Sequence, residues 1–249
     1  MKKILEIKKK IANDWFKTLQ KKMIDQFQLI ESEASKKNKK KIKYFIKREW
    51  KKSIKKEGGG TSYLLSGGKI FDKIGINQST VSGKFKKVFR SKILGAEKNG
   101  KYWASGISVV AHMRNPKIPA LHFNTRFIVT SKAWFGGGMD ATPSYNDKKE
   151  KNFIHERLRA VCKLNNKNYN KYKKWCDKYF YLPHRKEPRG IGGIFFDYET
   201  KDWEKNFKFV QDLGNEFTYL TKQIIINKKK LKWTERDKDQ QSYKRGRYV

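Results

Sequence analysis

KYWASGISVVAHMRNPKIPALHFNTRFIVT, residues 101–130, contains the two clearest predicted strands of the chain, at residues 101–112 and 120–130. Apolar and polar side chains alternate along the second of them, which predicts a strand with one face on a core and one polar face. The joining segment contains Pro116 and Pro119, which interrupt strand pairing and fix a bend. We therefore expect an antiparallel pair of strands.

The polar face of this pair is where we expect a site. If the bend is centred on residue 117, His112 lies opposite His122 and Ser108 lies opposite Arg126, with Asn124 between them. Such a face could also be the solvent side of an antiparallel sheet. However, solvent-facing positions elsewhere in this chain are rich in lysine, and this face has none. That contrast favours polar groups gathered around a ligand.

The flanking segments predict packing elements without chemistry of their own. Residues 1–35 and 201–224 carry apolar side chains three or four apart, which predicts two long amphipathic helices. The triplet Gly58–Gly60 lacks the Gly-Lys-Ser/Thr ending of a phosphate-binding loop, so we interpret it as a turn or bulge. A second triplet, Gly136–Gly138, predicts a strand that ends where the backbone comes close to another group. The last residues, 247–249, have the pattern of the start of a strand.

Composition limits the classes of protein. The 249 residues include 60 Lys and Arg against 24 Asp and Glu, a formal net charge of +36. That charge allows a nucleic-acid-binding protein. But 49 of the basic residues are lysines spread over nearly every segment, while the 11 arginines, suited to binding carboxylates, cluster centrally. We therefore favour an anionic small-molecule ligand over nucleic acid. No apolar run is long enough to span a membrane, and two cysteines in helix-like segments indicate a reducing cytoplasm.

The four histidines, His112, His122, His155 and His184, are 10, 33 and 29 residues apart. No HExxH or CxxC pattern accompanies them, so a metal site is only weakly indicated by spacing. General acid–base catalysis or hydrogen bonding by neutral imidazole is an equally good interpretation.

Three long strings carry a resemblance to a known family: SVVAHMRNPKIPALHFNTRF (108–127), WFGGGMDATPSY (134–145) and KKWCDKYFYLPHRKEPRGIGGIFFD (173–197). Together with GGGTSYLLSGGKIFDKIGIN (58–77) and RGRYV (245–249), they resemble the oxygen-dependent coproporphyrinogen III oxidases of haem biosynthesis. The resemblance implies an α+β fold, a large antiparallel β-sheet flanked by helices on both sides, in a single domain over residues 1–249. It also implies a homodimer.

The implied reaction is the oxidative decarboxylation of two propionate side chains of coproporphyrinogen III to vinyl groups, giving protoporphyrinogen IX. O₂ is the co-substrate and no organic cofactor is implied. By the resemblance, His122 is the proton donor, and the substrate-binding positions are Ser108, Asn124, Thr125 and Arg126. It also links His112, His122, His155 and His184 to a divalent metal cation. Asp140 is our own candidate for a second acid–base group or an acceptor for pyrrole N–H.

One departure concerns the C-terminus. The family continues beyond RGRYV with a strand and a Gly-rich loop, so we expect this domain to be C-terminally incomplete relative to it. Three alternatives remain: a porphyrinogen-binding fragment with impaired catalysis, a metal-dependent oxygenase, and a basic nucleic-acid-binding protein.

Overall fold

A computed structural model describes residues 2–39 and 41–247. Its main feature is one seven-stranded sheet in the order β1-β2-β3-β4-β5-β6-β9, in which every neighbouring pair is antiparallel. The strands are β1 (Ile46–Lys51), β2 (Gly58–Ser66), β3 (Phe71–Lys84), β4 (Lys101–Met113), β5 (Ala120–Val129), β6 (Ala133–Thr142) and β9 (Gly192–Glu199). Two short strands, β7 (Tyr181–Leu182) and β8 (Glu187–Pro188), form a separate ribbon.

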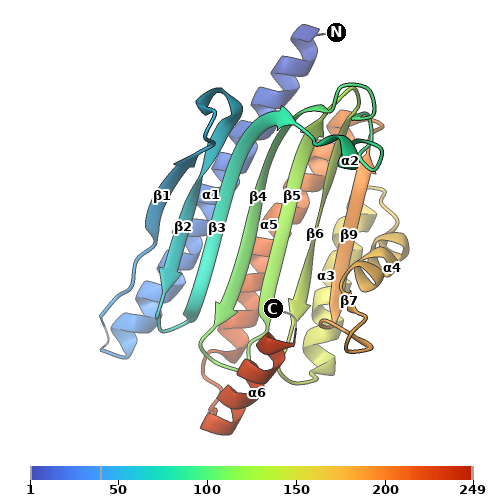
Figure 1. Cartoon of the computed structure of the whole chain (residues 1–249). Helices are drawn as coiled ribbons and strands as arrows, with labels where there is room; N and C mark the ends of the chain where they lie inside the picture. Colours follow the sequence, from blue (N-terminus) through green and yellow to red (C-terminus); the bar gives the residue numbers. More distant parts are fainter. Residues whose placement is uncertain (1, 40, 248–249) are drawn as a thin grey trace.

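Helices lie on both sides of the sheet, but unequally (Figure 1). The long helices α1 (Lys2–Lys37) and α5 (Trp203–Lys228), together with α3 (Lys148–Leu164), cover one face. Helix α4 (Tyr169–Tyr179) packs on the edge strand β9, and α6 (Glu235–Gly246) lies across one end of the opposite face. Two single turns, α2 (Lys87–Arg90) and the 3₁₀ helix η1 (Lys55–Glu57), complete the chain. The predicted α+β class and helix-flanked sheet are confirmed.

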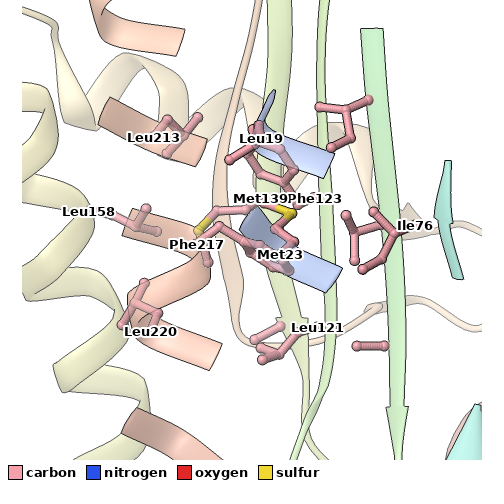
Figure 2. Packing of buried hydrophobic residues seen from close by; sticks show 14 of the residues in the cluster. Leu19, Met23, Ile76, Leu121, Phe123, Met139, Leu158, Leu213, Phe217 and Leu220 are labelled. Carbon is pink, nitrogen blue, oxygen red and sulfur yellow. The ribbon is translucent and has the colours of Figure 1, made fainter. Parts of the chain in front are cut away.

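The core lies between the sheet and the long helices. Alternate residues of β4 and β5 are buried on this side, as the period-2 pattern predicted. Figure 2 shows the side chains of Phe123, Met139 and Ile76 from the sheet meeting those of Met23 from α1 and Phe217 from α5. The rings of Phe123 and Phe217 stack with centroids 4.9 Å apart. Burying these large apolar side chains stabilises the layering, since each contributes about 1.5–3 kcal/mol.

The pairing of β4 with β5 differs from the prediction by two residues. Ser108 lies opposite Asn124, and Val110 lies opposite His122, so the bend is centred on residue 116 rather than 117. The Asn115 side chain sets this turn, accepting from the Lys117 amide and donating to the Leu231 carbonyl oxygen. Because a shift of two residues keeps every side chain on its predicted face, the polar face has the predicted residues despite the shift.

Both glycine triplets lie inside strands, contrary to the prediction of turns or ends. A Cβ on Gly59 would lie 2.1 Å from the Trp50 carbonyl oxygen of β1, and one on Gly60 would lie 2.3 Å from the Gln78 carbonyl oxygen of β3. The glycines therefore permit close strand approach. At the C-terminus Arg247 follows α6 in a turn, so the predicted strand at 247–249 does not begin there, and its last two residues lie outside the described chain.

Among the described residues, no helix has the length and apolar character needed to cross a membrane.

Candidate active site

The candidate site occupies the sheet face opposite α1 and α5, which we call the open face. It is formed by the even-numbered residues of β4 and β5, whose side chains alternate with the buried ones, and by those of β6, in which residues on both faces are buried. Strand pairing places His122 directly opposite Asp140, Asn124 opposite Gly138, and Arg126 opposite Gly136. Each functional side chain is thus fixed by a strand paired on both sides.

The first cluster on this face joins His122, Asp140 and Arg189. The Asp140 carboxylate is buried and accepts a hydrogen bond from the Arg189 guanidinium at 2.6 Å. The same guanidinium nitrogen lies 3.0 Å from Nδ1 of His122, and Oδ1 of Asp140 lies 3.3 Å from that Nδ1. The Cζ atom of Arg189 also lies over the Phe180 ring, 3.6 Å from its centroid, which is a favourable cation–π contact. The acid–base pair His122 and Asp140 is therefore in contact with the guanidinium of Arg189.

The second cluster surrounds Arg126. Its guanidinium donates to Oδ2 of Asp197 at 2.6 Å and to Oδ1 of Asn124 at 3.1 Å. Trp134 Nε1 donates to the other carboxylate oxygen of Asp197 at 3.1 Å. The guanidinium is therefore held in a fixed orientation at the surface of the sheet, as a carboxylate-binding fork requires.

A β-bulge directs Asp197 toward this cluster. Phe135 pairs with Glu199 but Gly137 pairs with Phe196, so β9 has one extra residue opposite Gly136. Tyr198 in the bulge has a φ of +58°, in the left-handed region. A Cβ on Gly136 would lie 2.1 Å from Oδ1 of Asp197. The bulge and the missing side chain together let the carboxylate approach the sheet surface.

Two cavities adjoin on the open face and share His122 and Asp140. One, of about 240 Å³, is lined by Val110, His112, Ala120, Leu121 and Thr142 together with Arg189. The other, of about 220 Å³, is lined by Ser108, Asn124, Arg126, Gly138 and the rings of Tyr179, Phe180 and Phe195. A ligand with a broad apolar body and anionic arms fits such a pair of hollows, because aromatic rings line one of them and a guanidinium group lines each. A third cavity, of about 860 Å³, lies at the ends of α1 and α5, and among the described residues neither histidine nor arginine lines it.

The structure brings together most of the predicted site residues. Ser108, His122, Asn124, Arg126 and Asp140 all line the second cavity. Thr125 is the exception, since its side chain is fully buried on the helix-covered face and its hydroxyl has no hydrogen-bond partner. The Thr125 hydroxyl therefore does not face the substrate cavities.

The four histidines do not come together. His112 and His122 line one cavity, whereas His155 is buried in α3 and His184 is exposed in the turn between β7 and β8. The His155 Nε2 lies 2.9 Å from the Ile191 carbonyl oxygen and its Nδ1 lies 2.8 Å from the Tyr169 hydroxyl, so both ring nitrogens are engaged.

In the part of the chain that the structure describes, no group of three or more His, Cys, Asp or Glu side chains could hold a metal ion. The described residues of this chain do not fit the predicted four-histidine metal site, and we derive no step from it.

Burial keeps His112 neutral. Its pKa is lowered from 6.5 to about 4, first by burial and then by the positive charge of Arg245 on α6. The Nδ1 atom of His112 is buried without a hydrogen-bond partner. Burial also raises the pKa of the Cys162 thiol to about 12, and both cysteines are free and buried, so neither is a reactive thiolate.

Sequence reasoning missed Arg189, Asp197 and Phe180. Arg189 lies in the segment PHRKEPRG, which has the composition of a loop, and Asp197 lies in an apolar strand far along the chain from β5. The signal that could have found Arg189 is its residue type, because an arginine in a central cluster suits carboxylate binding better than the lysines around it.

Comparison with known proteins agrees with this geometry. The family described as Coproporphyrinogen III oxidase matches residues 11–249. Oxygen-dependent coproporphyrinogen-III oxidases of Rickettsia bellii (strain RML369-C) and Rickettsia rickettsii (strain Sheila Smith) are each 45% identical to this chain over 243 residues. Those residues are 97% of this chain and 86% of each relative. A match over nearly the whole length, with the described polar groups lining the open face, shows that the chain belongs to the coproporphyrinogen III oxidase family.

Proposed function

We propose that this chain catalyses the O₂-dependent oxidative decarboxylation of two propionate side chains of coproporphyrinogen III, giving protoporphyrinogen IX. The observation that carries the proposal is the convergence of the His122–Asp140–Arg189 and Arg126–Asn124–Asp197 clusters on two adjoining cavities. The family membership supplies the reaction that such a site can serve.

The reaction sets what the residues have to do. For each propionate, the side chain R–CH₂–CH₂–COO⁻, one O₂ and one proton give R–CH=CH₂, CO₂ and H₂O₂. The C–COO⁻ bond and one C–H bond break, a C=C bond forms, and the two electrons and the hydrogen lost pass to O₂. The substrate is itself the reductant, because these electrons come from the broken C–COO⁻ and C–H bonds of its side chain. The protein therefore has to anchor carboxylates, exclude water and deliver or remove protons.

Each of these roles has a candidate. Arg126 presents a fixed guanidinium beside Asn124 and Ser108, where it would bind a substrate carboxylate through charge-assisted hydrogen bonds. His122, at the boundary of both cavities, would move protons at the reacting ring, and Asp140 would stabilise its protonated form. The rings of Phe180 and Phe195 would cover the macrocycle.

In the test, anaerobically prepared coproporphyrinogen III is mixed with the protein, once in the presence of O₂ and once in its absence. The products are then separated by chromatography. If protoporphyrinogen IX appears only with O₂, the proposal is supported. If the protein binds coproporphyrinogen III but forms no product, the alternative of porphyrinogen binding with impaired catalysis is supported. His122→Ala should lower kcat by about 10²–10⁴-fold, the usual contribution of a positioned acid–base group, with a smaller effect on KM.

A second variant separates this proposal from four-histidine metal catalysis. His184 is exposed and lines neither of the two cavities, so His184→Ala should retain activity. Equal loss in His184→Ala and His122→Ala, restored by a divalent metal, would refute the proposed roles and favour the metal-dependent oxygenase.

We also propose that the protein is a cytoplasmic homodimer. Two buried free thiols suit a reducing compartment. The edge strand β1 carries exposed apolar side chains at Ile46 and Trp50, which a second chain could cover. Light scattering coupled to gel filtration measures the oligomeric state directly.

A further inference from the structure

The Nδ1 atom of His122 has two neighbours of opposite chemical character. A nitrogen of the Arg189 guanidinium lies 3.0 Å away, and a carboxylate oxygen of Asp140 lies 3.3 Å away. A guanidinium only donates hydrogen bonds, and a carboxylate only accepts them. Nδ1 cannot satisfy both at once: it accepts from Arg189 when it carries no proton, and donates to Asp140 when it does.

The choice between the two partners determines what the other ring nitrogen can do. In neutral imidazole only one nitrogen carries a proton. If Nδ1 accepts from Arg189, the proton is on Nε2, and Nε2 can donate a hydrogen bond but cannot take a proton. If Nδ1–H donates to Asp140, the lone pair of Nε2 is free to take a proton from substrate. Only the second tautomer is a base at Nε2.

The structure of the free protein favours the first tautomer. The contact with Arg189 is the shorter of the two, and the same guanidinium nitrogen already donates to Oδ2 of Asp140 at 2.6 Å, so only Oδ1 of the carboxylate contacts Nδ1. Arg189 is held in place by the Phe180 ring at 3.6 Å and by a hydrogen bond of 3.1 Å from its amide to the Phe180 carbonyl oxygen. In this arrangement His122 is a hydrogen-bond donor at Nε2 and not a base.

We propose that Arg189 selects the tautomer of His122, and that a substrate carboxylate releases the base by drawing Arg189 away from Nδ1. This inference rests on the proposed function for the identity of the ligand. Arg189 lines the cavity of about 240 Å³ beside neutral His112, whereas Arg126 lines the other cavity. A carboxylate entering this cavity therefore meets Arg189 as its cationic partner. Nδ1–H then donates to Asp140, and Nε2 becomes a base with no net change in the protons on the ring.

The first test is spectroscopic and does not depend on turnover. In ¹⁵N-histidine NMR at about pH 8, above the usual histidine pKa of about 6.5, protonated and unprotonated ring nitrogens have well separated shifts. His122→Gln identifies the resonances among the four histidines. We expect the Nε2–H tautomer of His122 in the free protein, and a shift toward Nδ1–H in Arg189→Met.

Coproporphyrin III, the oxidised macrocycle with the same propionates, should move the wild-type resonances in the same direction as Arg189→Met. Arg185→Met is the matched control, because Arg185 is exposed in the same ribbon and the substitution is identical. It should leave the His122 resonances unchanged. An Nδ1–H tautomer in the free wild-type protein, or no change in Arg189→Met, overturns the inference.

Kinetics give a second measurement with its own outcome. Arg189→Met should raise KM about 10-fold or more through loss of a charged hydrogen bond, while kcat falls less than in His122→Ala because the base is already released. A kcat as low as that of His122→Ala contradicts tautomer selection. If no product forms in any variant but the NMR shifts occur, the inference stands and the proposed reaction fails.

Discussion

Replacing Arg126 by methionine should weaken the binding of a tetrapyrrole carboxylate. A hydrogen bond to a charged group contributes about 1.5–3 kcal/mol, and each 1.4 kcal/mol is tenfold in affinity, so the loss should be about 10- to 150-fold. Asp197 and Asn124 already engage both terminal nitrogens of the guanidinium, at 2.6 and 3.1 Å. Because Asp197 also neutralises part of its charge, we expect the lower end, about 10-fold.

Titration calorimetry with coproporphyrin III measures this affinity without turnover. The control is the double variant Arg126→Met/Asp197→Asn. A single Arg126→Met change leaves the Asp197 carboxylate, 16% exposed, without its cationic partner, and this negative charge alone would repel the ligand. If the lower affinity is due to loss of the hydrogen-bond donors of Arg126, the double variant also binds coproporphyrin III weakly. Unchanged affinity in Arg126→Met, or full recovery in the double variant, would refute the assignment of Arg126 as a carboxylate anchor.

Two further predictions concern stability. Buried Glu31 accepts hydrogen bonds from the amides of residues 69–71 at the β2–β3 turn. Glu31→Ala should therefore lower the free energy of unfolding, measured in urea, by at least about 3 kcal/mol. Glu33 is exposed, so Glu33→Ala should lower it little. The pKa of His112 is about 4 because of burial and the charge of Arg245, so the folded state binds fewer protons than the unfolded state between about pH 4 and 6.5. Stability should therefore fall as the pH is lowered through this window, by about 1 kcal/mol at pH 5 after halving for solvent screening. His112→Gln should remove that part of the pH dependence, and an identical pH dependence in the variant would contradict it.

The sequence predicted which side chains share a face, because alternation is a local property of a strand. His122, Asn124 and Arg126 were placed together correctly. The sequence did not predict which residues of the neighbouring strand lie opposite these side chains. The β4–β5 pairing was wrong by two residues because the turn is set by hydrogen bonds of the Asn115 side chain, one of them to a carbonyl more than a hundred residues away.

The remaining site residues come from distant segments. Asp197 reaches Arg126 through the β6–β9 pairing and a bulge, and Arg189 reaches Asp140 from a ribbon outside the main sheet. Neither contact has a local periodic signal, since it depends on which strands are neighbours. The resemblance to a known family supplied the predicted role of His122, but only the folded structure shows a guanidinium 3.0 Å from its ring nitrogen.

The walls of the two cavities differ in how firmly they are held. Ser108, Asn124 and Asp140 stand on strands hydrogen-bonded on both sides, so their part of the wall is as rigid as the sheet. Phe180 and Arg189 flank a ribbon of two-residue strands, and so small a ribbon has little stability of its own. A macrocycle is wide compared with either hollow. Its entry and release should therefore depend on motion of residues 180–190, so this ribbon would set the rate of product release.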